Sequence, residues 1–272
     1  RRMEARDSFK SRLGFILVSA GCAIGLGNVW KFPYICGAYG GAAFILIYLC
    51  FLVILGIPVL VAEFAVGRGS HTSVAKCFDK LAPAGSCWKP LKFIGIIGCY
   101  MLMMFYTTVG GWMLYYCFKS LRGDFVGADT EAVAGAFSNM MGDAPTMILW
   151  MVIVCVIGFI VCFMGLQNGI EKITKVMMGA LLIIMLVLAV HSVMMDGAGE
   201  GIKFYLIPDF QKIRDAGLGN VIFAALSQSF FTLSIGIGAM LIFGSYLDKS
   251  RSLTGEAVSI TVLDTFVALT AG

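Results

Sequence analysis

Two long apolar stretches contain the polar residues that could do chemistry in this sequence. The first includes GCAIGLGNVWKFP, residues 21–33, with three glycines and Asn28. The second includes QSFFTLSIGIGAM, residues 228–240, with a glutamine, three hydroxyl residues and two glycines. If both helices unwind at these glycines, carbonyl oxygens are freed as ligands for a hard cation, and the new helix N-termini favour an anion. Paired interruptions of this kind are typical of the binding sites of secondary transporters.

The same glycines have a simpler interpretation as close-packed helix faces of the small-xxx-small kind. Packing glycines do not require Asn28, Thr232 and Ser234 beside them, however. Irregular backbone at the depth of the bilayer centre is tolerated only where it is buried or lines a cavity. The polar neighbours therefore favour unwinding over simple packing.

Long uncharged runs predict the elements that hold these residues. Only 13% of the residues are charged, against about 25% in soluble domains, and a helix needs about 20 apolar residues to cross the hydrocarbon core. The runs are Leu13–Trp30, Ala42–Ala62, Phe93–Phe118, Ala144–Asn168, Val176–Met195, Ala216–Leu247 and Ala257–Gly272. We therefore expect an all-α integral membrane protein with about seven helices, the chain ending inside the seventh.

The distribution of charge predicts the orientation in the membrane. Threading the runs through a bilayer places most basic residues on one side, and the acid-rich loops 124–143 and 196–215 on the other. By the positive-inside bias, residues 1–12 form a cytoplasmic N-terminal segment. No cleavage motif follows the first run, so no signal peptide is expected. The net charge of +4 follows from this asymmetry and does not call for a nucleic-acid partner.

Several other classes of protein are disfavoured. The nine cysteines show no CxxC or Cys/His metal spacing, and His71 and His191 are far apart. An enzyme within the membrane would need a nucleophile–base pair, a metal or paired carboxylates at depth, and the runs contain none of these. A channel would normally need a continuous polar stripe, whereas the polarity here is confined to two points. A seven-helix receptor is excluded less firmly, because helix count alone would allow it.

Four segments of the sequence are long motifs: RLGFILVSAGCAIGLGNVWKFPYICGAYGGAAF, GIPVLVAEFAVGRG, GIEKITKVMM and SQSFFTLSIGIGAMLIFGSY. They resemble the neurotransmitter:sodium symporter family, most strongly its bacterial amino-acid transporters. The likeness runs through the whole chain in order and covers about seven of the family's eleven or twelve helices. It implies the LeuT-type inverted-repeat (5+5) transporter fold, with unwound first and sixth helices.

The resemblance also implies a division of the chain. Residues 13–195 would form the first five-helix repeat, 196–217 an extracellular loop, and 218–272 the start of the second inverted repeat. The eighth and tenth helices of the family would be missing. These residues alone are therefore not expected to transport.

The resemblance places binding sites at the two breaks. The first sodium site would take the Ala23 carbonyl and the side chains of Asn28, Thr232 and Asp264. A second, incomplete sodium site would use the carbonyls of Gly21 and Ile24, with further ligands in the missing eighth helix. The residues implied to bind substrate are Ala23, Leu26, Gly27, Leu102, Tyr106, Phe231, Thr232, Ser234 and Ile237.

Each part of an amino acid would have its own partners. The Leu26 and Gly27 amides and the Tyr106 hydroxyl would bind the carboxylate. The Ala23, Phe231 and Thr232 carbonyls, with Ser234, would bind the ammonium group, and Leu102, Phe231 and Ile237 would form the apolar pocket. Each of these residues also has an ordinary structural interpretation. Tyr106 could be a buried tyrosine without a role in binding. Phe231 and Ile237 could be core residues, and Leu102 could face lipid.

Gly25 bears on the substrate class. In the family's monoamine carriers an aspartate stands at this position and replaces the carboxylate that monoamines lack. With glycine here, only a substrate with its own carboxylate would give the sodium ion and the Leu26 and Gly27 amides an anionic partner. We therefore expect an α-amino acid, and the apolar pocket favours a hydrophobic or aromatic one. The residues do not identify which amino acid it is.

Asp264 lies in the middle of an apolar run, where a carboxylate is unfavourable by a few kcal/mol and is a functional candidate by default. Its alternative is a protonated, hydrogen-bonded structural acid. Chloride-dependent relatives have asparagine at this position. The equivalent of their chloride site is Tyr48, Gln228, Thr232 and Asp264, with Ala268 in place of a serine. We expect the Asp264 carboxylate to replace chloride, so that transport is chloride-independent.

The gates match the family less closely. Arg6 corresponds to the inner-gate arginine near Tyr246, with Phe9 replacing the usual tryptophan. Lys31 stands where the outer gate has an arginine, and lysine lacks the bidentate fork. Glu63 is expected to hydrogen-bond to the unwound part of the sixth helix, with a plain interfacial carboxylate as the alternative.

Together these features predict a sodium-coupled symporter that imports an amino acid by alternating access. It would be a multi-pass protein of the cell (inner) membrane, with Na⁺ and no organic cofactor, and it would not be an enzyme. A non-transporting amino-acid sensor on the same fold is the alternative. The sodium stoichiometry, any proton exchange and the oligomeric state stay open.

Overall fold

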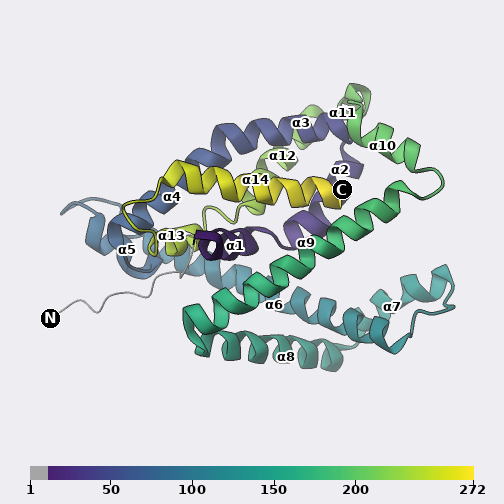
Figure 1. Ribbon diagram of the computed structural model, residues 1–272, viewed down its shortest axis with the longest axis horizontal. Helices are drawn as coiled ribbons and strands as arrows, with labels where there is room; N and C mark the ends of the chain where they lie inside the picture. The colour runs from purple at the N-terminus through teal and green to yellow at the C-terminus, as the bar shows by residue number, and fades with distance from the viewer. Residues whose placement is uncertain (1–11) are drawn as a thin grey trace. The chain divides into compact units, whose positions relative to one another are not determined.

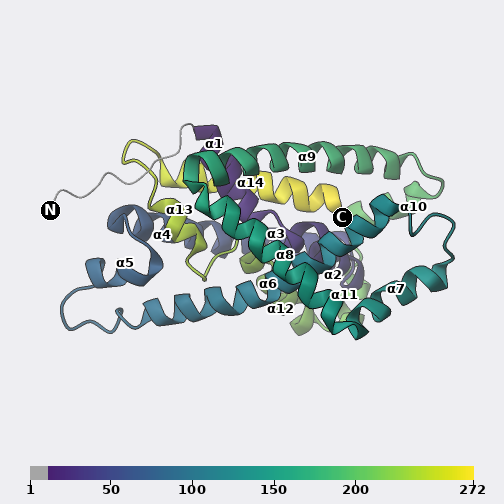
Figure 2. The same cartoon turned by 90° about the horizontal axis from the view of Figure 1, so that it is seen from below.

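The computed structural model describes residues 12–272, except for the side chains of residues 166–168. The regular elements of this part of the chain are helices (Figures 1 and 2). Among the described residues, five helices are long and apolar enough to cross a membrane: Ala42–Ser70, Leu91–Arg122, Ala144–Phe163, Gly169–Val193 and Leu253–Ala271. A bent helix pair between Arg12 and Ala38 makes a sixth crossing if it is counted as one span. The predicted fold class, an all-α multi-pass membrane protein, is therefore confirmed.

The chain divides into two compact units, and the first holds residues up to Gly95 together with Glu171–Gly272. Its N-terminal part contains α1 (Arg12–Ala23), the π-helical turn η1 (Gly27–Lys31), α2 (Phe32–Ala38), α3 (Ala42–Phe51), η2 (Leu52–Gly56), α4 (Ile57–Ser70) and α5 (Val74–Leu81). Its C-terminal part contains α9 (Lys172–Val193), α10 (Ala198–Leu206), α11 (Phe210–Ala216), α12 (Leu218–Thr232), α13 (Ala239–Gly244) and α14 (Leu253–Ala271). The helix α14 packs against α1, η1, α4 and α9, so it lies at the centre of the helices that carry the candidate site.

Fully buried aromatic side chains form the core around this centre. The ring centroids of Phe32 and Tyr48 are 5.2 Å apart, and those of Phe44 and Tyr48 are 6.5 Å apart. All three residues are 0% exposed. This cluster joins α2 to α3 immediately after the first helix break, and it therefore fixes the position of the segment that follows the break.

The second span contains a π-helical turn that the hydropathy pattern does not predict. The turn η2 lies between α3 and α4, and Pro58 stands in the first turn of α4. Proline has no N–H to donate to the carbonyl one turn earlier, and such sites commonly adopt irregular helical geometry. The span is nevertheless continuous from Ala42 to Ser70.

The helices α4 and α13 approach so closely that only glycine fits at two positions. A Cβ atom added at Gly67 would contact the Leu241 carbonyl oxygen and lie 2.9 Å from the Ser245 nitrogen. One added at Gly244 would lie 2.7 Å from the backbone of Phe64. Because these neighbours are backbone atoms, they have little freedom to move. The short helix α13 is thus held directly on α4.

The last helix begins earlier than the apolar run that predicted it. We expected the run to start at Ala257, but α14 starts at Leu253, after an N-cap in which Ser252 Oγ accepts a hydrogen bond from Gly255 N at 3.2 Å. Glu256 is included in the helix and is only 3% exposed. Glu256 lies in the first turn of α14, where the helix dipole favours an acid, and it pairs with Arg12.

The second unit comprises residues Ile96–Ile170. It holds most of α6 (Leu91–Arg122), α7 (Thr130–Gly142), α8 (Ala144–Phe163) and the start of η3 (Leu166–Glu171). Asp143 caps α8 by accepting hydrogen bonds from the hydroxyl and the N–H of Thr146, at 2.6 and 3.2 Å. These bonds hold the pKa of Asp143 below its usual value. Gly111 of α6 packs on the α8 backbone, because an added Cβ would lie 2.8 Å from Met151 N.

Candidate functional site at the two broken helices

The first helix is interrupted between α1 and η1, and the two halves are bent by 53°. At the interruption, the N–H of Gly25 donates to Asn28 Oδ1 at 3.3 Å rather than to the carbonyl of Gly21, one turn earlier. The Asn28 side chain therefore takes the place of a lost backbone acceptor. The predicted unwinding at the glycines is present.

The sixth helix is interrupted between Thr232 and Ala239, where residues 233–238 form turns. The backbone φ angle is positive at Ser234 (50°), Gly236 (89°) and Gly238 (78°). Glycine adopts this region without penalty, whereas serine does not. The Ser234 hydroxyl donates to the Cys22 carbonyl at 3.1 Å, so the two breaks are in direct contact.

A buried hydrogen-bond cluster joins three of the predicted sodium ligands. Asn28 Nδ2 donates to Asp264 Oδ1 at 2.9 Å and to the Asp264 carbonyl at 3.1 Å. The Thr232 hydroxyl donates to Asp264 Oδ2 at 2.8 Å. All three residues are 0% exposed. The structure thus brings together side chains that are far apart in the sequence and supplies an amide, a hydroxyl and a carboxylate at one point.

Further buried oxygen atoms accompany this cluster. The Tyr48 hydroxyl lies by the hydroxyls of Thr232 and Thr265. Gln228 Nε2 donates to the Gly27 carbonyl at 2.9 Å, but Gln228 Oε1 is buried with no hydrogen-bond partner among the described residues. Buried polar atoms without partners are unfavourable unless water or an ion satisfies them. The donor set consists of oxygen atoms, which Na⁺ prefers as a hard cation. The residues present therefore fit a sodium site.

Glu63 of α4 binds the backbone of the interrupted sixth helix. Its Oε1 accepts from Gly236 N at 2.6 Å and its Oε2 from Leu241 N at 3.3 Å. The expected hydrogen bond from Glu63 to the unwound segment is confirmed, and the alternative of a plain interfacial carboxylate is not supported. The carboxylate supplies acceptors for two N–H groups that the break leaves outside the helical pattern.

Replacing Glu63 with glutamine is expected to weaken substrate binding at least tenfold and to destabilise the protein by about 1–3 kcal/mol, because one acceptor becomes an NH₂ group that faces a backbone N–H. Ligand titration and thermal unfolding of the purified protein would measure both effects. Glu200→Gln is the matched control, since the Glu200 side chain is 82% exposed and pairs with Lys203 on the surface. Equal behaviour of the two variants would contradict the prediction.

Lys31, the expected outer-gate residue, lies over the ring of Phe231. Its Nζ is 4.3 Å from the ring centroid, which is the geometry of a cation–π interaction. A Cβ atom added at Gly27 would lie 2.9 Å from Cδ1 of the same ring. The Phe231 ring is therefore held between the glycine of one broken helix and the lysine that follows it.

The remaining predicted site residues lie in different parts of the chain. Ala23, Ile24 and Gly27 are buried at the first break, while Gly21 and Leu26 are partly exposed there. Ile237 lies in the turn of the sixth helix, and Tyr246 follows α13. Leu102 and Tyr106 lie on α6 in the second unit, so their roles stay predictions. Arg6 and Phe9 lie outside the described residues.

An ion pair that the sequence does not predict joins the start of α1 to the start of α14. Arg12 Nε lies 3.0 Å from Glu256 Oε1, and Arg251 Nη1 lies 3.6 Å from the same oxygen. The Glu256 side chain is 4% exposed. Arg68 Nη1 also donates to the Arg251 carbonyl at 2.8 Å. The only sequence signal was a glutamate directly before the last apolar run, and its partner is 244 residues away.

We expect Arg12→Gln to destabilise the protein by about 1–2 kcal/mol, because it removes a charged partner from a buried carboxylate. In a Glu256→Gln background the same substitution should have less than half that effect. A double-mutant cycle of thermal or denaturant unfolding would measure the coupling. Additive effects of the two substitutions would show that the pair does not contribute to stability.

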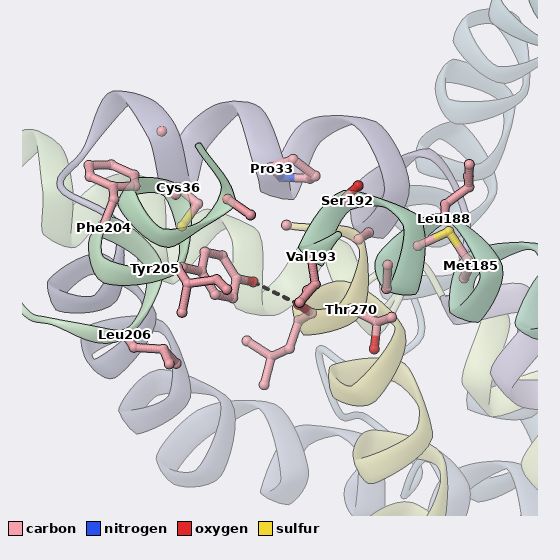
Figure 3. Close-up of a pocket in the computed structure, with 18 of the residues that line it drawn as sticks. Pro33, Cys36, Met185, Leu188, Ser192, Val193, Phe204, Tyr205, Leu206 and Thr270 are labelled. Atoms are coloured by element: carbon pink, nitrogen blue, oxygen red, sulfur yellow. Dashed lines mark hydrogen bonds between the residues drawn. The ribbon is translucent and has the colours of Figure 1, made fainter. Parts of the chain in front are cut away.

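The structure also contains a cavity of about 790 Å³ between α2, α9, α10 and the end of α14 (Figure 3). Pro33, Cys36, Ser192 and Thr270 line it, and the Tyr205 hydroxyl at its wall donates to the Leu269 carbonyl at 3.0 Å. None of the lining residues is charged, and none is a predicted site residue. A site for an amino acid must bind both a carboxylate and an ammonium group. The free N–H groups and carbonyls at the two breaks can bind these two groups. No residue that lines the cavity carries a charge to pair with either of them.

Two interrupted membrane helices in contact, with buried oxygen ligands at the breaks, are the arrangement of secondary transporters with discontinuous helices. A profile of the sodium:neurotransmitter symporter family matches residues 6–133 and 130–272. The chain belongs to this family, as its motifs predicted. Its curated relatives are transporters and not enzymes.

Individual relatives agree with this assignment. The chain is 36% identical over 262 residues to an uncharacterized sodium-dependent transporter, YhdH, of Bacillus subtilis, covering 96% of the chain and 57% of that protein. It is 32% identical to an uncharacterized sodium-dependent transporter of Haemophilus influenzae, covering 98% and 60%. The crystal structure of MhsT in complex with L-phenylalanine matches with a TM-score of 0.88 and 38% identity, again covering 98% and 60%. The chain thus spans about three-fifths of the length of these proteins.

Proposed function

We propose that the protein is a sodium-coupled symporter of an α-amino acid that works by alternating access. The observation that carries the proposal is the meeting of Asn28, Thr232 and Asp264 at the two helix breaks, fully buried and joined by hydrogen bonds. A carboxylate at this depth is stable only with partners or a cation. Sodium would satisfy Asp264 while also taking oxygen ligands from Asn28, Thr232 and the Ala23 carbonyl.

Sodium binding would be coupled to closure because its ligands come from three helices. Asn28 lies in η1, Thr232 at the end of α12 and Asp264 in α14. One ion that binds all three stabilises the arrangement in which the two breaks are in contact. We also propose a second, incomplete sodium site at the carbonyls of Gly21 and Ile24. Its other ligands would come from the family's eighth helix, which these residues do not include.

The substrate would lie beside the breaks. We propose that its carboxylate meets the N–H groups of Leu26 and Gly27 at the start of the second half-helix, where the helix dipole favours an anion. Its ammonium group would meet carbonyls at Ala23, Phe231 and Thr232, with the Ser234 hydroxyl. Tyr106 would contact the carboxylate, and Leu102, Phe231 and Ile237 the apolar side chain. The absence of a side chain at Gly25 requires the substrate to bring its own carboxylate.

The bound phenylalanine in the MhsT structure supports a hydrophobic or aromatic substrate, because that protein is 38% identical to this chain.

The proposed chloride independence rests on Asp264. A carboxylate beside sodium supplies the negative charge that an anion would otherwise provide, with Tyr48 and Gln228 next to it. We also propose, from the distribution of basic residues between the two sides of the membrane, that the N-terminus lies in the cytoplasm.

Equilibrium binding of radiolabelled leucine, phenylalanine, tryptophan and tyrosine to the purified complete protein tests the proposal. Saturable binding in sodium but not in potassium, without chloride, is the expected result. Uptake into proteoliposomes driven by a sodium gradient should follow. Binding without uptake would indicate a sensor on the same fold, and no binding in either salt would overturn the proposed substrate class.

A further inference from the structure

The segment between α4 and α6 is firmly attached by one face of the short helix α5. Val74 and Cys77 are buried and pack with Leu241 of α13. A Cβ atom added at Gly238 would contact the Val74 side chain, so the approach to the turn of the sixth helix is close. The ring of His71 hydrogen-bonds the Ser245 carbonyl at 3.1 Å. This face of α5 is therefore occupied within the protein.

The opposite face of α5 carries more lysines than acidic residues. Lys76, Asp79 and Lys80 lie at helical spacings of three and four residues, so they share one face. Residues 74–92 contain four lysines and one aspartate, which leaves three net positive charges. The aspartate is already used, because Lys92 Nζ lies 2.7 Å from Asp79 Oδ2. Lys80 Nζ donates to the Ser70 carbonyl at 2.7 Å.

Two of the four lysines have no acidic partner. Lys76 and Lys89 are exposed, and neither forms an ion pair among the described residues. The residue next to Lys89 is Trp88, whose side chain is also outside the core, with 62% exposure. Tryptophan with lysine is the combination that anchors proteins at the level of lipid headgroups.

The position of this segment in the chain places it at the membrane surface. The span Ala42–Ser70 ends just before residues 74–92, and the span Leu91–Arg122 begins at their end. The first residues of α6 expose Phe93 and Ile94, as expected for contact with acyl chains. Lysines at this level attract anionic lipids, and an indole ring is most stable between acyl chains and headgroups.

We propose that this basic segment binds the phosphate of anionic lipid headgroups through its unpaired lysines, Lys76 and Lys89, with Trp88 seated in the bilayer interface. The charge complementarity selects anionic over zwitterionic lipids, since a phosphatidylcholine headgroup carries its own cation. Lys80 and Lys92 contribute to the local potential but are occupied by Ser70 and Asp79. The site is separate from the helix breaks and does not depend on the proposed transport activity.

Native mass spectrometry of the complete protein in detergent tests this site, with phosphatidylglycerol and phosphatidylcholine added as probes. The wild type is expected to retain phosphatidylglycerol in preference. Each of Lys76→Gln and Lys89→Gln should weaken this binding about fivefold, and phosphatidylcholine binding should not change. The matched control is the double variant Lys203→Gln and Lys212→Gln, which removes the same charge from the loop three membrane crossings later in the chain.

Fluorescence gives a second measurement that does not depend on the lysine substitutions. The emission of Trp88, obtained as the difference between wild type and Trp88→Phe, should be quenched more by brominated phosphatidylglycerol than by brominated phosphatidylcholine. Equal lipid binding by wild type and the Lys76→Gln/Lys89→Gln double variant would overturn the proposal. So would an equal loss in the control variant.

Discussion

Replacing Asp264 with asparagine is expected to weaken sodium-dependent amino-acid binding about 10- to 100-fold in chloride-free buffer, since it removes a charged ligand from a buried site. Asn28 and Thr232 both donate to the Asp264 carboxylate. In the variant, the NH₂ group of Asn28 and that of the introduced amide compete for acceptors, and no negative charge is left for sodium. Scintillation proximity binding across a sodium titration would measure the change.

Chloride should partly restore binding in the same variant. With the carboxylate replaced by an amide, the hydroxyl of Tyr48, the Gln228 amide and the hydroxyl of Thr232 would surround a space without a negative charge, and these groups can donate hydrogen bonds to an anion. Thr261→Val is the control on the same helix, because Thr261 Oγ1 is buried without a recorded partner among the described residues. If Asp264→Asn neither weakened binding nor made it sensitive to chloride, the proposed role of this carboxylate would be abandoned.

The second large effect concerns stability. Gly67→Ala is expected to lower the free energy of unfolding by about 1–3 kcal/mol, because its Cβ would overlap the backbone of α13 at Leu241 and Ser245. Backbone atoms cannot rotate away as a side chain can. The temperature of half-inactivation in detergent, measured as loss of the monodisperse peak after heating, would report the change.

Gly37→Ala in α2 is the matched control. An added Cβ at Gly37 meets no atom within 4 Å, and alanine is favoured over glycine in a helix by about 1 kcal/mol. The control should therefore be neutral or stabilising. A Gly67→Ala variant as stable as its control would mean that α13 can move away from α4 without loss, contrary to the close packing described here.

Hydropathy and glycine spacing were sufficient to predict the membrane spans and the places where two of them break. These features are local: apolar runs have the length of a bilayer, and Gly21, Gly25 and Gly27 stand next to Asn28. The motifs predicted the family for the same reason, since they are long and continuous. The contact between Glu63 and the sixth helix was correctly expected but not distinguished from its alternative, because one carboxylate in a sequence does not name its partner.

The features that were missed depend on contacts between distant residues or on chain geometry. Glu256 looks like a helix boundary until Arg12 is known to lie 3.0 Å away. The short helices α10 and α11 lie in a segment that was expected only to be a loop. The Nζ atom of Lys31 lies over the Phe231 ring, a contact that the place of this lysine at the expected outer gate does not indicate. No local pattern reveals that these side chains meet.

The interruption of the sixth helix has a consequence for how the protein is made. Its two helical parts have 15 and 6 residues, each shorter than the roughly 20 needed to cross the hydrocarbon core. Polar backbone between them is unfavourable in lipid until another part of the protein satisfies it. Glu63, which accepts hydrogen bonds from Gly236 and Leu241, is synthesised more than a hundred residues earlier. During biosynthesis the second span is therefore already present when the sixth segment emerges, and it can serve as the template on which an otherwise unstable segment enters the membrane.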